Sequence, residues 1–282
     1  MSDQWQQILE QARQIQEQAR KDGGPLWFRG HRRREWQLES TLHRHVKTLM
    51  SECGIPSKPD EARQLLRDEY KSLFRHFKRD AWPLLSESER SDWGLIFAMR
   101  HYGIPARLLD WTESFACALF FAQYGRQPDE DAAIFALYPE RLNLVAIGEE
   151  GLAQLGDRDP TLINLDLFHP GCVPPDKDLP TIAAGPIFTN PRMLAQLAGF
   201  TLSGDRFEPL DDQFGGKLRA EGIVAKLELP SATFADAEDF LRLVGVNAFS
   251  FFPDREGLRM KHEARVRQTI ADARHFYPAG AK

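Results

Sequence analysis

The order of helical and extended segments along the chain constrains its fold more than any other feature. Before residue 104, apolar residues recur at the helix period in 5–19 and in 60–80, and a third helix ends at Gly103. Beyond residue 130, short apolar runs between prolines and glycines are typical of strands. Helices that come first and strands that come later, without strict alternation, predict an α+β fold. We expect a central mixed, mainly antiparallel sheet with flanking helices.

The expected strands and later helices follow from the same patterns. Strands are predicted at 25–30, 106–110, 132–139, 142–148, 162–168, 199–202 and 221–230. Helices are predicted from Thr112 as N-cap, from Asn190 as N-cap to Gly199, and from near Ser231 and near Asp254. We divide the chain into an N-terminal helical extension, 1–24, and one domain with C-terminal helices, 25–282.

Composition excludes several classes of protein. The chain has 282 residues and three cysteines without a CxxC spacing, which argues against a disulfide framework and against a zinc site. His43 and His45 lack a further ligand at a suitable spacing, so no metal is expected. No apolar run approaches the roughly 18 residues of a membrane span. We therefore expect a soluble, cytoplasmic protein that does not contact a membrane. The P-loop, Rossmann, zincin and serine-hydrolase motifs do not occur.

A basic segment interrupts an acidic chain. The net charge is −5, which argues against general nucleic-acid binding, but Arg29–Arg34 is strongly basic and Arg44 follows it. Such a segment attracts a phosphate or polyanion locally, although a solvated loop has the same pattern. Arg29 ends an apolar run beside Gly30 in "WFRG". There its guanidinium can clamp a phosphate or carboxylate, and the glycine lets a ligand or another segment approach the backbone. A structural ion pair of Arg29 is the alternative.

The stretch "HYGIPARLLDWT", 101–112, crowds polar groups before an apolar helix. His101 and Tyr102 lie at the end of a helix, where a histidine binds a ligand or simply caps carbonyl groups. In an extended segment, Arg107 and Asp110 lie on opposite faces, and Trp111 covers one side. A buried Arg107–Asp110 ion pair that fixes the turn is the structural alternative, because buried charges require partners.

These two blocks resemble the FRG domain, a bacterial and phage family named for its Phe-Arg-Gly motif. "LWFRGHRRREWQLESTLHR" contains that motif, and "HYGIPARLLDWT" resembles the family's second block. "RMLAQLAGFT" and "FFPDREGL" resemble later family motifs, so the similarity extends over about 25–260. Ala106 stands where the family usually has threonine, and Arg100 where it commonly has glutamine.

The chain also shows a fold-level similarity to ADP-ribosyltransferases and their Arg–Ser–Glu layout. This similarity implies NAD as cofactor, with Arg29 on its phosphate or ribose and Tyr102 or Trp111 stacked on nicotinamide. Gln196 stands at the third position instead of glutamate, so Asp110 or Asp254 would supply the negative charge. The candidate catalytic residues are therefore Arg29, Tyr102, Asp110 and Gln196. The candidate ligand-binding residues are Gly30, His31, His101, Gly103, Arg107, Trp111 and Thr112.

Two functions follow from these candidates. The first is an NAD-dependent ADP-ribosyltransferase-like enzyme of bacterial toxin, stress or phage-defence biology, with a protein or nucleic-acid acceptor. The second is a non-enzymatic module that senses a nucleotide or a nucleic-acid end through Arg29, the Arg32–Arg34 run, His101 and Arg107. A scaffold without a ligand is a third class, which predicts that loss of Arg107 lowers stability only.

Overall fold

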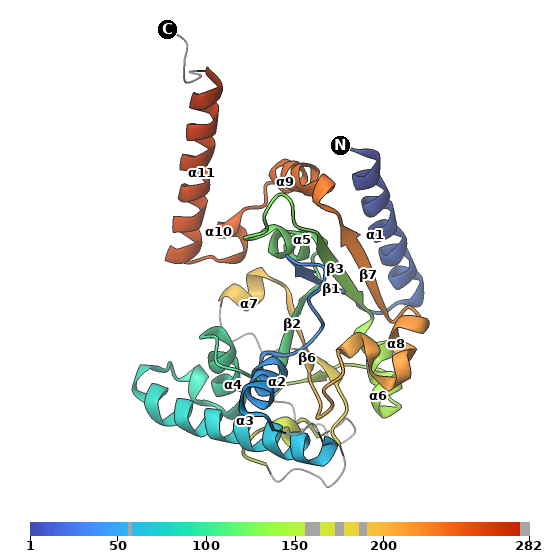
Figure 1. The fold of residues 1–282 in the computed structure, drawn as a ribbon, viewed down its shortest axis with the longest axis vertical. Coiled ribbons are helices and arrows are strands. Elements are labelled where there is room, and N and C mark those ends of the chain that lie inside the picture. The colour runs from blue at the N-terminus through green and yellow to red at the C-terminus, as the bar shows by residue number, and fades with distance from the viewer. Residues whose placement is uncertain (56–57, 156–163, 173–177, 186–190, 277–282) are drawn as a thin grey trace.

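A computed structural model describes residues 1–55, 58–155, 164–172, 178–185 and 191–276 (Figure 1). Within these residues the sheet has seven strands in the order β4-β5-β6-β2-β1-β3-β7, antiparallel except for the pair β4–β5. The strands are β1 (Trp27–His31), β2 (Leu108–Thr112), β3 (Ala132–Leu137), β4 (Ala153–Gln154), β5 (Ile182–Gly185), β6 (Ala198–Leu202) and β7 (Val224–Leu229). The predicted α+β fold with a mixed, mainly antiparallel sheet is thus confirmed.

Helices flank this sheet, as the sequence predicted. They are α1 (Asp3–Asp22), α2 (Thr41–Cys53), α3 (Pro59–Ala81), α4 (Asp92–His101), α5 (Phe115–Gln123), α6 (Pro139–Ile147), α7 (Pro191–Ala195), α8 (Lys217–Ala220), α9 (Phe234–Leu243), α10 (Ala248–Phe251) and α11 (Arg255–Phe276). Helix α1 begins where the Ser2 hydroxyl accepts a hydrogen bond from the Trp5 amide, and it ends at Gly23 with φ 77°. Its Trp5 is completely buried, and Tyr138 Oη donates to Ile15 O at 2.9 Å, so α1 packs on the domain.

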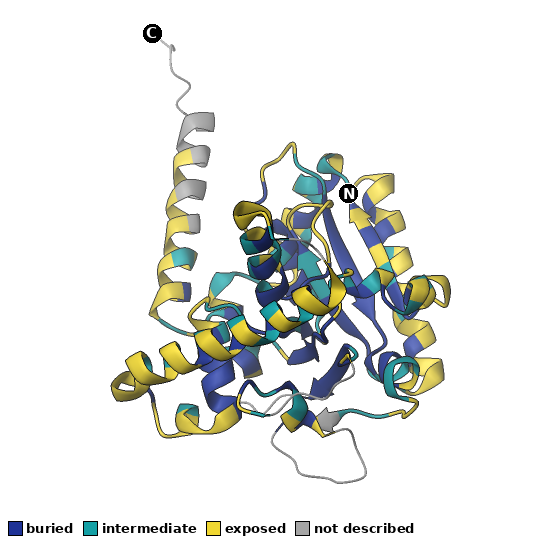
Figure 2. Cartoon of the chain, turned by 60° about the horizontal axis from the view of Figure 1, so that its bottom comes forward, coloured by how far each residue is buried: buried dark blue, intermediate teal, exposed yellow. Residues whose placement is uncertain are grey.

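The apolar core consists of two clusters, and the strands β2 and β5 contribute residues to both. The first includes residues of β1, β3 and β7 with α1, α5 and α9. The second includes residues of β5 and β6 with α2, α3 and α4. Burial of these faces drives the fold, because each strand is apolar on at least one side. Figure 2 shows the dark-blue strands inside and the mostly exposed α11, which projects away from the domain.

Two predicted strands are wrong. Residues 142–148 lie mostly in α6, because Pro139 occupies the first turn of this helix and Gly148 ends it with φ 78°. The short apolar run misled the prediction, since such a run fits a buried helix as well as a strand. In the other segment, Leu165–Phe168 is a 3-10 helix that Asn164 caps, while 162–163 lie outside the described residues.

Two predicted helix ends also differ from the structure. Ser114, not Thr112, caps α5, because Ser114 Oγ accepts a hydrogen bond from Cys117 N. Helix α7 ends at Ala195, and Gly199 lies within β6, where a Cβ atom would come 2.6 Å from the Trp27 indole. The predicted cap Asn190 lies outside the described residues. The helices near Ser231 and Asp254 are confirmed as α9 and α11.

Two kinds of feature are absent from the described residues. No helix in the described part of the chain has both the length and the apolar character to cross a membrane. The same residues contain no group of three or more histidines, cysteines, aspartates or glutamates that could hold a metal ion.

Candidate functional site

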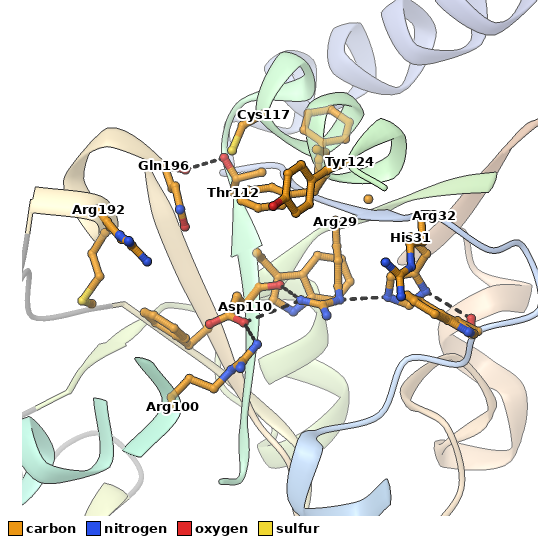
Figure 3. Close-up of a pocket in the computed structure, with 18 of the residues that line it drawn as sticks. Arg29, His31, Arg32, Arg100, Asp110, Thr112, Cys117, Tyr124, Arg192 and Gln196 are labelled. Atoms are coloured by element: carbon orange, nitrogen blue, oxygen red, sulfur yellow. Dashed lines mark hydrogen bonds and ion pairs between the residues drawn. The ribbon is translucent and has the colours of Figure 1, made fainter. Parts of the chain in front are cut away.

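A cavity of about 830 Å³ opens where β1 and β2 diverge. Within the described chain these strands pair only at Phe28 and Thr112. Beyond that pair the Arg29 side chain reaches from β1 to β2, and its Nη1 donates to the Asp110 carbonyl oxygen at 2.5 Å. A side chain therefore takes the place of a continued ladder of backbone hydrogen bonds, and Arg29 and Asp110 both line the cavity at this point (Figure 3).

Gly30 is required by helix packing. A Cβ atom at this position would lie 1.8 Å from Ala118 O and 2.7 Å from Ala122 N, both in α5. No side chain fits at such distances, so only glycine lets α5 lie directly on β1. Gly30 also lines the cavity, but the segment that approaches its backbone closely is α5.

The Arg29 guanidinium is held from two sides. Its Nε donates to His31 Nε2 at 2.9 Å, and its Nη1 bonds Asp110 O. Because His31 Nε2 accepts, the ring proton is on Nδ1, which lies 3.2 Å from Trp36 O and donates to it. Burial, reinforced by the charge of Arg29, lowers the pKa of His31 to about 3. A neutral His31 therefore orients Arg29 near neutral pH.

Positive charge exceeds negative charge in the depth of the cavity. The Asp110 carboxylate bonds Arg100 Nη2 and lies 3.9 Å from Arg29 Nη1. Arg44 lines the same cavity and donates to Glu39 O at 2.6 Å. The pKa of Arg29 is lowered to about 10, mainly by burial, while Asp110 opposes this decrease and the charges of Arg100 and Arg44 contribute to it. An anion placed here would relieve that repulsion.

Two more carboxylates line the cavity, but neither forms an ion pair with Arg29, Arg44 or Arg100 among the described residues, and of the two only Glu39 acts electrostatically on Arg44. The carboxylate of Glu39 binds Lys47 Nζ, and Glu35 is exposed on the loop after β1. Arg192, on the α7 side, forms an ion pair with Asp254 at 2.5 Å. The cluster of Arg29, Arg44 and Arg100 around Asp110, which we call the arginine cluster, therefore keeps a net positive charge.

Aromatic rings flank the arginine cluster. Phe121, Tyr124 and Phe252 line the cavity beside α5, and the Tyr124 ring stacks on Phe120 at a centroid distance of 5.7 Å. Trp36 lines it on the loop after β1. The cavity thus combines planar apolar surfaces with a central cationic region, which suits a ligand that has aromatic and anionic parts.

Comparison with known proteins identifies a domain in part of the chain. The model of the FRG domain matches residues 24–131. This chain contains an FRG domain. The match includes both Arg29 and Asp110, and with them the two strands that diverge at the cavity. No curated protein and no solved structure matches the chain.

Most of the predicted site residues, from within the FRG match and beyond it, line one cavity. They are Arg29, Gly30, His31, His101, Asp110, Trp111, Thr112 and Gln196. Thr112 Oγ1 donates to Gln196 O at 2.5 Å, which joins β2 to the segment after α7. Gln196 Nε2 donates to Phe251 O at 3.1 Å. Trp111 is only 2% exposed, and its Nε1 donates to Thr201 Oγ1, so its indole belongs to the core.

Three predicted residues, Tyr102, Gly103 and Arg107, are not in the lining of this cavity. Arg107 is buried elsewhere, with Nη1 bonded to Ser203 O and Gly204 O and Nη2 to Asp205 at 2.8 Å. The considered Arg107–Asp110 pair does not form, because Asp110 bonds Arg100 instead.

Tyr102 lies at the end of α4 and is 61% exposed. Its ring centroid is 6.5 Å from that of Phe77, in α3. Gly103 follows it with φ 77° and ends the helix, which is a conformational role. Alternation along an extended segment placed Arg107 and Asp110 on different faces, but it could not show which face meets a ligand.

Sequence reasoning missed several lining residues. Cys117, Tyr124 and Arg192 drew no functional interpretation, and Arg100 was noted only as a departure from the family pattern. A charged residue at the end of the apolar helix "GLIFAMR", directly before His101, was the available signal for Arg100. Cys117 gave no signal, and burial raises its thiol pKa to about 12, so it stays protonated and unreactive.

Proposed function

We propose that the FRG-domain cavity binds NAD and that the chain transfers its ADP-ribosyl group to an acceptor. The observation that carries this proposal is one cavity lined both by the arginine cluster and by aromatic rings, with Trp36 on the loop after β1 and Phe121 on α5. A dinucleotide has complementary parts, with two planar rings joined through a charged pyrophosphate. The volume of about 830 Å³ lies within the range typical of cofactor sites.

The phosphates bind the arginine cluster. Guanidinium groups recognise phosphate oxygens through paired, charge-assisted hydrogen bonds. Arg29 is already oriented by His31 and Asp110 O, so little side-chain entropy is lost on binding. Its side chain is 17% exposed, which leaves part of the guanidinium accessible from the cavity.

The nicotinamide end lies beside α5. Tyr124 and Phe121 offer ring surfaces there, and Gln196 and Thr112 offer polar groups. In the transfer, the bond between the ribose C1′ and the nicotinamide nitrogen breaks, and its electron pair leaves with nicotinamide. The acceptor then bonds C1′ and loses a proton. Positive charge develops on the ribose, and we assign its stabilisation to Asp110, whose carboxylate lines the cavity.

One observation favours the alternative, a sensor that binds the nucleotide without cleaving it. Asp110 bonds Arg100 and lies near Arg29, so two cations reduce the negative charge that it offers to a ribose. A phosphate that competes for Arg100 would release this carboxylate, whereas a phosphate bound to Arg29 alone would leave it neutralised. The two functions therefore differ in one measurable step.

The experiment measures NAD binding by calorimetry and nicotinamide release by chromatography. We expect Arg29→Ala to weaken NAD binding about 10- to 150-fold, the worth of a charged hydrogen bond. Asp110→Asn keeps most of the binding but loses release. Arg242→Ala is the matched control, because Arg242 is 68% exposed and pairs with Asp239 outside the cavity.

The outcomes separate the candidates. Release by the wild type that Asp110→Asn abolishes supports transfer. Binding of NAD without release in the presence of cell extract favours the sensor. Absence of binding of NAD, ADP-ribose and ADP at millimolar concentration refutes both.

A further inference from the structure

We infer that Trp36 is the platform on which the base of the bound nucleotide stacks. This inference rests on the proposed function and adds a subsite to it. Trp36 lies on the loop after β1, lines the cavity and is 41% exposed. An indole that faces water in a cavity offers a planar apolar surface, and stacking of a nucleobase removes that surface from water.

Trp36 is connected to the phosphate-binding arginine. Its carbonyl oxygen accepts from His31 Nδ1 at 3.2 Å, and His31 Nε2 accepts from Arg29 Nε at 2.9 Å. The indole also meets the His31 ring edge to face, with centroids 6.2 Å apart. One hydrogen-bonded chain therefore sets the position of the base platform relative to Arg29. A base and a phosphate of the same nucleotide can bind both ends of this chain at once.

Arg32 covers the indole in the free protein. Its guanidinium carbon lies 4.9 Å from the ring centroid, and the side chain makes no hydrogen bond or ion pair with another residue in the described part of the chain. A planar base that takes this face displaces only an exposed cation–π contact. Arg32 is labelled beside His31 in Figure 3, on the side of the site away from Gln196 and Arg192.

Trp82 provides an internal comparison. It is also 41% exposed, and Arg90 lies 5.4 Å from its ring centroid. Trp82 follows α3 and is not among the residues that line the cavity. An exposed tryptophan beside an arginine is therefore not unusual in this protein. Trp36 differs from Trp82 because it lines the cavity and its carbonyl oxygen accepts the hydrogen bond of His31.

The experiment compares ligands that differ only in the base. Calorimetry measures the affinity of AMP and of ribose 5-phosphate for the wild type, Trp36→Ala, Trp36→Phe and Trp82→Ala. We expect Trp36→Ala to weaken AMP about 5- to 150-fold, the range for base–aromatic stacking. Ribose 5-phosphate should change less than about twofold, because its phosphate still meets Arg29. Trp36→Phe keeps most of the affinity for AMP, and Trp82→Ala keeps all of it.

A second measurement covers the case in which Trp36→Ala folds poorly. Stacking of AMP quenches the fluorescence of the indole beneath it, so quenching seen in the wild type disappears in Trp36→Phe although AMP still binds. Quenching that persists in Trp36→Phe, or equal affinity of Trp36→Ala and wild type for AMP, overturns the inference. If those results accompany loss of NAD binding in Arg29→Ala, the proposed function still stands. If the wild type binds no nucleotide, both the proposed function and the inference about Trp36 are refuted.

Discussion

Replacement of Asp205 by asparagine removes the carboxylate that holds two buried guanidinium groups. The Asp205 side chain is completely buried, and Arg107 and Arg67 are 3% and 11% exposed. Oδ1 accepts from Arg107 Nη2 at 2.8 Å, and Oδ2 accepts from Arg67 Nη2 at 2.6 Å and from Leu179 N at 2.9 Å. Asparagine keeps the size of the side chain but offers neutral groups to both cations.

The expected loss of stability follows from this burial. Removal of one partner of a buried ion pair costs about 3–5 kcal/mol, because the remaining charge is left without compensation. Arg107 is left in that state, since its other bonds go to the neutral carbonyls of Ser203 and Gly204. For a domain of this length the loss corresponds to a decrease of about 5–8 °C in Tm.

The same contacts predict a pH dependence. Burial alone raises the pKa of Asp205, but Arg107, Arg67 and the Leu179 amide together hold it below its usual value. The folded state therefore favours the ionised form. The carboxylate contributes its full stability above the unfolded pKa of about 4, and this contribution is lost as the pH falls through the lower folded value. Asp205→Asn should lack this acid-dependent loss.

Urea denaturation at pH 7.5 and at lower pH measures both effects. Asp239→Asn is the control, because Asp239 bonds Arg242 at 2.8 Å while both side chains are more than half exposed. We expect the control to change the free energy of unfolding by less than about 0.5 kcal/mol. A loss below about 1 kcal/mol in Asp205→Asn would refute the reasoning. Nucleotide affinity should not change in either variant.

Three further predictions concern single positions. Gly30→Ala should lower the free energy of unfolding by about 3 kcal/mol or more in urea, because the new Cβ atom meets Ala118 O at 1.8 Å. Burial lowers the pKa of both His31 and His43 to about 3, so each imidazole stays neutral in the folded state. Acidification from pH 7 to 5 should therefore lower the free energy of unfolding by about 2 kcal/mol for each histidine. His43→Gln should remove the part that belongs to His43, which is about half of the combined loss. Tyr102→Ala should leave NAD affinity unchanged in calorimetry, since the side chain is 61% exposed and outside the cavity lining; a large loss of affinity there contradicts the assigned site.

Local sequence patterns predicted the elements that depend on local chemistry. Helix ends at Gly23 and Gly103 follow from left-handed backbone that glycine adopts readily. The strand predicted at 142–148 is wrong because this apolar run fits a strand and a helix equally. The proline at the start of α6 favours the helix. Periodicity measures which side of a segment is apolar, and in short runs it does not measure the backbone conformation.

The site was predictable to the extent that its residues lie in contiguous motifs. Arg29 and Asp110 each stand at a strand position that the sequence singled out, and both line the cavity. The prediction of Arg107 as a ligand-binding residue was wrong because its partner, Asp205, is 98 positions away, and nothing in the local pattern identifies such a pair. For the same reason the local pattern could not predict that Asp110 pairs with Arg100 rather than with Arg107.

The single pairing of Phe28 with Thr112 has a consequence for motion. On one side of it lie β1, β3 and β7, whose buried residues belong to the first apolar cluster, and on the other lie β2, β6 and β5, of which β2 and β5 contribute to both clusters. Fewer backbone hydrogen bonds join β1 to β2 than join either strand to its other neighbour. Regions with fewer such bonds open at lower free energy than the elements beside them. Amide hydrogens at this junction should therefore exchange faster than those of the β1–β3 and β2–β6 ladders. A molecule that contacts Arg29 and Asp110 at once would connect the two sides of this junction. Its binding should therefore slow hydrogen exchange at the junction, even where the change in Tm is small.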